Sequence, residues 1–276
     1  MDLATIVGFV AGLVILMTVM ILDGGSPVEL ISHPAAILLI VGGSLAATTI
    51  SSPLREVLKL PKLIVLAITQ NRFEPLEVIE LITRMADKAR REGLLALEDE
   101  AKKIKEPFLQ KGIMMVVDGV DPHQVREILE SSIRHMESRH KAGAGLFAAA
   151  GGFSPTFGII GTVMGLISVL KQLDDPNKLA KSIASAFLAT LWGLLMANLI
   201  YLPIASKLKA RSEEEVQYRH MIMEGILAIQ AGENPRIVRE KLLAYLPPKY
   251  AASAEKQSEK QGATKSTETK KARAEA

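Results

Sequence analysis

The chain has 276 residues, of which 49% are hydrophobic and 23% are charged, so it combines membrane-grade segments with strongly charged ones. It contains no cysteine, which excludes a disulfide framework, a thiolate metal site and a cysteine nucleophile. The net charge is +3, but aromatic residues make up only 4% and basic residues are interleaved with acidic ones. This pattern does not indicate a nucleic-acid partner.

Two apolar runs near the N-terminus predict two membrane spans at residues 3–22 and 34–50, within a first segment of residues 1–52. A bilayer core requires roughly 20 apolar residues of helix. Lysine and arginine are absent from residues 1–54, whereas residues 55–141 hold sixteen of them. Since basic segments stay on the cytoplasmic side of a membrane, we expect both the N-terminus and the C-terminus of this multi-pass chain in the cytoplasm.

Residues 53–141 predict a helical cytoplasmic domain. Pro75 suits a first helical turn, and apolar residues then recur at helical spacing, which predicts one buried and one charged face. Asp121 followed by Pro122 predicts the N-cap and first turn of a helix that runs toward the third span. Several glycines on that approach indicate a bend or close helix contacts. They are Gly143, Gly145, Gly151 and Gly152.

The third and fourth spans are expected at residues 146–170 and 183–206, within a membrane segment of residues 142–206. At about 100° per residue, small and hydroxyl residues share one face of each helix, within roughly 80° of arc on the third. Two interpretations remain open: close helix packing, or threonine hydroxyls presented to a passing ion. The faces comprise Pro155, Gly158, Thr162 and Gly165 on the third span and Ala186, Thr190, Gly193 and Ala197 on the fourth.

Pro155 and Pro203 interrupt these two spans. Each removes one helical hydrogen bond, so each is either a passive kink or a hinge that responds to nearby charge. None of the four spans contains Asp, Glu, Lys or Arg, although such residues usually mark ion pathways in membranes. If the chain conducts ions, a partner must therefore supply the carboxylate.

Catalytic chemistry has no support in the sequence. There is no G-x-x-x-x-G-K-[ST] loop, no G-x-G-x-x-G after a strand and no H-E-x-x-H, and the five histidines lack metal-ligand spacing. We therefore expect no catalytic residue, no cofactor and no metal site.

Charge, capping residues and apolar periodicity indicate the character of the remaining segments. Residues 89–100 are basic at the start and acidic at the end, which is typical of a solvated helix face or of a docking surface. Residues 207–250 predict two cytoplasmic helices, the second capped by Asn234 before Pro235. Residues 251–276 lack apolar periodicity, and we expect them to form a disordered tail.

Four motifs occur in order along the chain, with two predicted spans on each side of a long charged segment: ARREGLLALE (89–98), FSPTFGIIGTVMGL (153–166), LATLWGLLMANLIYLP (188–203) and QAGENP (230–235). Together they resemble the A-subunit of the bacterial flagellar stator, the MotA/PomA family, over roughly residues 1–250. The related ExbB/TolQ family, which energises outer-membrane transport or Tol-type complexes, is an alternative, but it normally has three spans, with one before its large cytoplasmic segment. A membrane scaffold without ion flux is another.

The resemblance implies an all-α membrane protein of the bacterial inner membrane, with four transmembrane helices and a large helical cytoplasmic domain between spans two and three. It also implies a torque generator in which a homo-pentamer ring surrounds the membrane helices of a MotB/PomB-type B-subunit dimer. That B-subunit carries the ion-binding Asp, which agrees with the missing carboxylate. The coupling ion is H⁺ or Na⁺, and Ala189, which stands where some sodium-type members have a second Thr, leaves the choice open.

The resemblance also assigns roles to single residues. The threonines fall on hydroxyl positions near the ion path, and the prolines on positions that couple ion flow to conformational change. Two charged residues fall where the family meets the rotor switch protein FliG. By motif position these are Thr162 and Thr190, Pro155 and Pro203, and Arg90 and Glu98, respectively.

Overall fold

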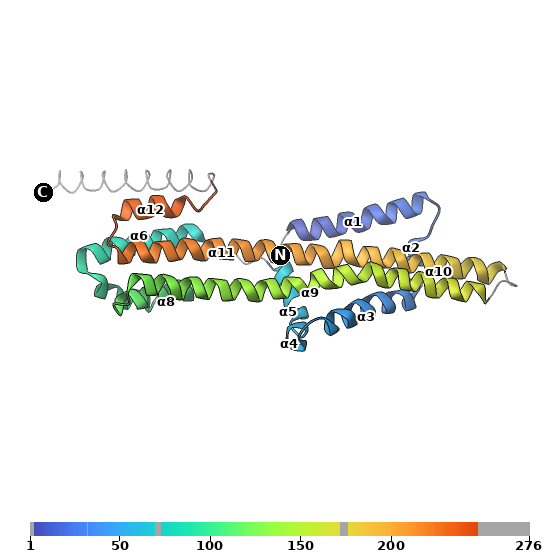
Figure 1. Ribbon diagram of the computed structural model, residues 1–276. Coiled ribbons are helices and arrows are strands. Elements are labelled where there is room, and N and C mark those ends of the chain that lie inside the picture. The colour runs from blue at the N-terminus through green and yellow to red at the C-terminus, as the bar shows by residue number, and fades with distance from the viewer. Residues whose placement is uncertain (1–2, 32, 70–72, 172–175, 248–276) are drawn as a thin grey trace, which may run out of the picture. The chain divides into compact units, whose positions relative to one another are not determined.

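The computed structural model describes residues 3–31, 33–69, 73–171 and 176–247, and every regular element in those ranges is helical (Figure 1). The chain divides into two compact units. Unit 1 comprises residues 1–71 and 137–212, and unit 2 comprises residues 72–136 and 213–276. The tail predicted from residue 251 onward lies outside the described residues.

Unit 1 contains the four apolar segments predicted to cross the membrane. Its helices begin with α1 to α5, and it includes parts of α9 and α11, with α10 and a π-helical turn between them. The bounds are α1 Leu3–Leu22, α2 Pro27–Ile31, α3 Pro34–Ile50, α4 Leu54–Val57, α5 Leu60–Ile68, α9 Pro122–Leu170, α10 Pro176–Leu195, the π turn Met196–Tyr201 and α11 Leu202–Gln230.

Three stretches in the described part of the chain are long and apolar enough to cross a membrane. They lie in Thr5–Leu22, Pro122–Leu170 and Ser182–Gln230. The predicted second span coincides with α3, an apolar helix of 17 residues. At 1.5 Å per residue α3 is about 26 Å long, at the short end of what spans a bilayer core. The four-span topology therefore stays a prediction.

Proline marks the start of many helices because it cannot donate a backbone hydrogen bond, and the first helical position does not require one. The predicted starts at Pro75 and Pro122 are confirmed. The Asp121 carboxylate accepts from the His123 amide at 2.9 Å, so the predicted N-cap is also confirmed. The helices that begin at proline start at Pro27, Pro34, Pro75, Pro107, Pro122, Pro176 and Pro235.

Unit 2 is a helical domain with its own apolar core. Its short helices are α6 Pro75–Glu92, a 3-10 turn Leu94–Leu97, α7 Glu98–Ala101, α8 Pro107–Val117 and α12 Pro235–Leu243. One face of α6 is buried as predicted, and it packs with the buried faces of α9 and α11. Apolar residues recur along α9 at helical spacing, which predicts one buried stripe, but Ile128 on that stripe is 40% exposed. The core includes Ile79, Ile82, Met85, Leu109, Ile113, Leu129, Ile133, Ile222 and Ile226.

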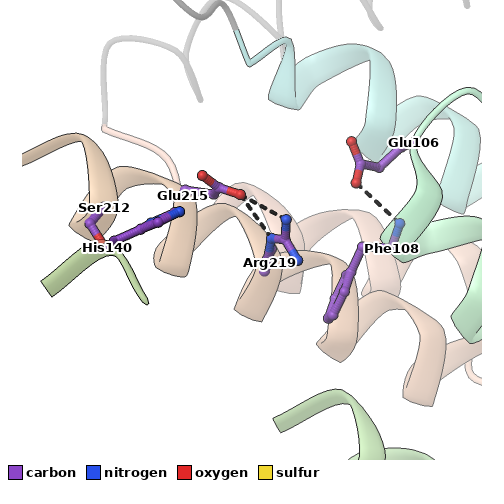
Figure 2. Close-up of polar contacts among 6 residues, drawn as sticks. All are labelled: Glu106, Phe108, His140, Ser212, Glu215 and Arg219. Atoms are coloured by element: carbon purple, nitrogen blue, oxygen red, sulfur yellow. Dashed lines mark hydrogen bonds and ion pairs between the residues drawn. The ribbon is translucent and has the colours of Figure 1, made fainter. Parts of the chain in front are cut away.

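Polar contacts fix helix ends within each unit. In unit 2, Glu106 caps α8 by accepting from the Phe108 amide at 3.2 Å, and the Arg219 guanidinium lies 5.2 Å from the Phe108 ring centre while it donates to Glu215 (Figure 2). In unit 1, Arg211 donates to the carbonyls of Leu66 and Thr69 at the end of α5. A cation at a helix C-terminus satisfies carbonyls that lack a helical partner.

Candidate ion pathway and coupling site

The small-residue face predicted on the third and fourth spans brings α9 and α10 into backbone contact. A Cβ atom added to Gly193 would lie 2.9 Å from the Ser154 carbonyl oxygen and 3.0 Å from the Gly158 Cα. At Gly165 an added Cβ would lie 2.6 Å from the Ala186 Cβ. The helices approach this closely only because these side chains are absent. The packing interpretation of this face is therefore confirmed.

The two predicted threonines meet within this contact. Thr162 Oγ1 and Thr190 Oγ1 are hydrogen-bonded to each other. Thr162 Oγ1 also lies 3.1 Å from the carbonyl oxygens of Gly158 and Ala186, and Thr190 Oγ1 lies 3.4 Å from that of Gly158. Both side chains are half-buried. Each threonine hydroxyl carries one proton to donate and two lone pairs. With both protons in these hydrogen bonds, lone pairs on the hydroxyl oxygens remain that could contact a cation.

The two prolines lie in different backbone environments. Pro155 lies inside the continuous α-helix α9 and is half-buried. Pro203 is exposed. It lies two residues beyond the π turn Met196–Tyr201, with Leu202 between them. The Leu202 amide, at the end of that turn, donates to the Ala197 carbonyl, five residues earlier. The sequence predicted a helical span at residues 183–206 but not this change of helical type.

Two glycines on the approach to the third span fit the close-contact interpretation. A Cβ added to Gly143 would lie 3.1 Å from Leu63 Cδ1, and one added to Gly151 would lie 2.7 Å from Leu202 Cδ2. At Gly145 and Gly152 no atom lies within 4 Å of the added Cβ. Helix α9 continues through all four positions, so they do not end the helix.

Unit 1 contains further polar contacts that the sequence did not predict. Ser154 donates to the Gly193 carbonyl at 2.9 Å, and the Trp192 indole donates to the Leu30 carbonyl at 2.8 Å. Ser44 Oγ lies 3.2 Å from the Tyr201 hydroxyl. The available signal was a polar side chain inside an apolar run, because such groups require a partner in hydrocarbon. His140 and Ser212, 3.2 Å apart, form a similar pair near the end of the unit (Figure 2).

The charge cluster at residues 89–100 lies in unit 2 on α6, the 3-10 turn and α7. Arg90 and Glu98 are both exposed. Glu98 pairs with Lys102 at 2.8 Å, and the hydrogen bond raises the pKa of the Lys102 ammonium. Arg90 has no hydrogen bond or ion pair among the described residues.

A second ion pair holds this cluster together. Lys88 donates to Glu100 at 2.8 Å, which connects α6 to α7, and the hydrogen bond raises the pKa of the Lys88 ammonium. Gly93 makes the turn between α6 and the 3-10 turn at φ 88°, a conformation that side chains rarely adopt. Within the described ranges there is no group of His, Cys, Asp or Glu residues that could hold a metal ion.

Comparison with known proteins covers nearly the whole chain. The family described as the MotA/TolQ/ExbB proton channel family matches residues 100–221, and the Motility protein A N-terminal family matches residues 6–93. Motility protein A of Bacillus subtilis (strain 168) is 37% identical over 269 residues, which is 97% of this chain and 99% of that protein.

Two solved structures are similar to this chain in fold. The structure of C. jejuni MotAB matches with a TM-score of 0.86 and 33% identity. The structure of the flagellar MotAB stator complex from Bacillus subtilis matches with a TM-score of 0.84 and 37% identity. Each match covers 90% of this chain and 97% of the other.

Proposed function

Because this chain belongs to the MotA/TolQ/ExbB proton channel family, we infer that it is the A-subunit of a bacterial flagellar stator, a membrane complex that converts ion flow into torque. The observation that carries this conclusion is the agreement with Motility protein A over 97% of the chain. The match of residues 6–93 to the Motility protein A N-terminal family favours the stator over an ExbB/TolQ-like energising subunit.

A B-subunit of the MotB/PomB type is the proposed partner. The apolar spans contain no carboxylate, and both similar structures are MotAB complexes. In our proposal the B-subunit supplies the ion-binding Asp, and five copies of this chain surround a dimer of it. Thr162 and Thr190 form part of the wall beside that carboxylate, since their hydroxyl oxygens could contact H⁺-carrying water or Na⁺.

Torque follows from a local change of charge in this proposal. Ion binding neutralises the partner's carboxylate, and this biases α9 near Pro155 and the start of α11 near Pro203 between two conformations. The cytoplasmic unit 2 then moves the rotor switch protein FliG. Arg90 is the favoured rotor contact because it is exposed and free of internal ion pairs, and Glu98 is an exposed carboxylate in the same cluster.

Deleting the gene tests the function. We expect loss of swimming with intact flagella, and recovery when this chain and its B-subunit are restored together. Any second stator set in the host is deleted first, so that it cannot mask the loss. Co-expression of both subunits should raise uptake of H⁺ or Na⁺, and swimming speed against sodium concentration identifies the ion. Ion uptake or swimming that does not depend on this chain would refute the proposal.

Charge reversal tests the rotor contact. Arg90→Glu and Glu98→Lys should each reduce torque while leaving the amount of stator in the membrane unchanged, because exposed charges steer docking more than they stabilise a fold. Arg236→Glu is the matched control, since Arg236 is an exposed cation of unit 2 on α12 that pairs with Glu240. Equal losses in the control and in Arg90→Glu would exclude a specific role.

Reporter fusions test the proposed four-span topology. Fusions after residues 28 and 175 should report the periplasm, and fusions after residues 100 and 260 the cytoplasm. A cytoplasmic signal at residue 28 would mean that α1 and α3 do not both cross the membrane.

A further inference from the structure

Three buried hydroxyls lie together between α3 and the π turn, in hydrogen bonds separate from those of Thr162 and Thr190. Ser44 and Thr48 are fully buried and Tyr201 is 6% exposed. Ser44 Oγ lies 3.2 Å from the Tyr201 hydroxyl oxygen, and Thr48 Oγ1 donates to the Ser44 carbonyl at 2.7 Å. A hydroxyl in an apolar span is costly without a partner, so this pairing is a requirement of the packed state.

The direction of the hydrogen bond follows from counting protons. Ser44 Oγ donates to the Val41 carbonyl, 3.2 Å away, and a serine hydroxyl carries one proton. With the Ser44 proton in that bond, Ser44 accepts from Tyr201, whose hydroxyl carries the other proton. The resulting chain runs from Tyr201 through Ser44 to the α3 backbone. It connects the last residue of the π turn to a neighbouring helix 157 positions away in sequence.

The π turn is the element that this hydrogen bond reaches. It is the one π-helical stretch in the described part of the chain, and Pro203, which has no backbone N–H, follows it. A π turn contains one extra residue, so its conversion to α-helix would rotate the following residues by about 100° and shift them by about 1.5 Å. Tyr201 would then leave Ser44. Conversion of the turn from π-helix to α-helix would therefore be a defined movement.

We propose that Tyr201 is a positioning residue whose hydrogen bond to Ser44 holds the turn Met196–Tyr201 in its π form, and that torque generation requires its reversible conversion to α-helix. This inference rests on the proposed stator function. Thr190, in the wall of the proposed ion path, lies six residues before the turn on the continuous helix that leads into it. Hydrogen bonds between membrane helices shift a two-state equilibrium by about 3- to 20-fold, which biases the turn without locking it.

Conservative variants test the hydrogen bond in the complete stator complex. Tyr201→Phe keeps the ring, Ser44→Ala removes the acceptor, and the double variant removes both. Thr48→Val is the matched control, because Thr48 is equally buried on α3 but its hydroxyl bonds its own helix. Two quantities are measured for each variant. One is the speed increment as each stator unit joins a single motor, and the other is ion uptake per complex.

Tyr201→Phe and Ser44→Ala should each lower the speed increment by at least about threefold while ion uptake stays within twofold of the original. The double variant should be no worse than Ser44→Ala, because both changes remove the same bond, and Thr48→Val should keep its increment. Unchanged increments in Tyr201→Phe, an equal loss in Thr48→Val, or a proportional fall of increment and ion uptake would overturn the proposal. Failure of the unaltered chain to restore rotation would refute the stator function instead.

Discussion

The helical backbone differs between the region around Pro155 and the region around Pro203. In α9 the helix remains α-helical through Pro155, in a contact where Ser154 donates to the Gly193 carbonyl of the next span. In the fourth span the helix changes to a π turn just before Pro203. A residue that removes a helical hydrogen bond can therefore leave the helical type unchanged or accompany a wider turn. The helix around Pro155 is braced by backbone contact, whereas the helix around Pro203 relies on a side-chain bond.

The largest effect should come from restoring a backbone N–H beside the π turn. Pro203→Ala removes a penalty of about 3 kcal/mol for proline in a helix and allows continuous α-helix, so the free energy of unfolding should rise while rotation is lost. Pro155→Ala should also raise stability but leave the helical type unchanged. Unfolding in detergent and the torque of single motors measure both changes. Identical losses of torque in the two variants would break the distinction between the two regions.

The close contact between α9 and α10 can be tested through its glycines. Gly193→Ala places a methyl group against the backbone of α9, so we expect a loss of about 1–3 kcal/mol in the free energy of unfolding. Gly152→Ala is the control, because no atom lies within 4 Å of the added carbon in this chain. Thermal unfolding in detergent measures the difference. Equal stability of the two variants would show that α9 and α10 do not approach as closely as described.

A smaller effect is expected at the threonine pair. Thr162→Val keeps the shape of the side chain and removes its hydroxyl, which should cost about 1 kcal/mol of stability and reduce ion uptake. Thr162→Ser restores a hydroxyl and should recover most of the uptake. Combining Thr162→Val with Thr190→Val completes a double-mutant cycle, and additive losses of stability would contradict the observed hydrogen bond.

The smallest effect concerns Tyr218, which lies on α11, the same helix that begins after the π turn, but in unit 2. Burial, with the carboxylates of Glu106 and Glu74 nearby, raises its pKa to about 12. Above its unfolded pKa of about 10 the unfolded chain releases a proton that the folded chain retains, so stability should fall as pH rises from about 10 to 12. With its partial exposure the loss is less than about 1 kcal/mol. Tyr218→Phe should show less alkaline destabilisation than the original chain in denaturation at pH 8 and 11.

Local signals predicted much of the fold because they depend on few neighbours. Proline at a first helical position and Asp121 before Pro122 act within one turn, so those helix starts were predicted. The shared face of Gly158 and Thr162 was also predicted, since helical spacing determines it. That this face meets the one carrying Thr190 depends on how two helices pack, which periodicity alone leaves open.

Contacts between segments that are distant in the sequence could not be predicted from it. The Tyr201 hydroxyl and Ser44 are 157 positions apart, and Arg211 reaches the end of α5 from 145 positions away. No local sequence pattern at Tyr201 or Arg211 indicates which residue it contacts. The exposed Ile128 shows the same limit, because an apolar stripe predicts a face but not the width that its neighbours cover.

The indole contact between Trp192 and Leu30 has a practical consequence. Trp192 is the single tryptophan of the chain, it lies beside Gly193 in the close contact of α9 with α10, and its N–H donates to the carbonyl of Leu30. The tryptophan fluorescence of the protein therefore comes from one position in the sequence, between Thr190 and the π turn. Movement of this helix should alter the emission of that indole, which makes the unlabelled protein its own optical sensor.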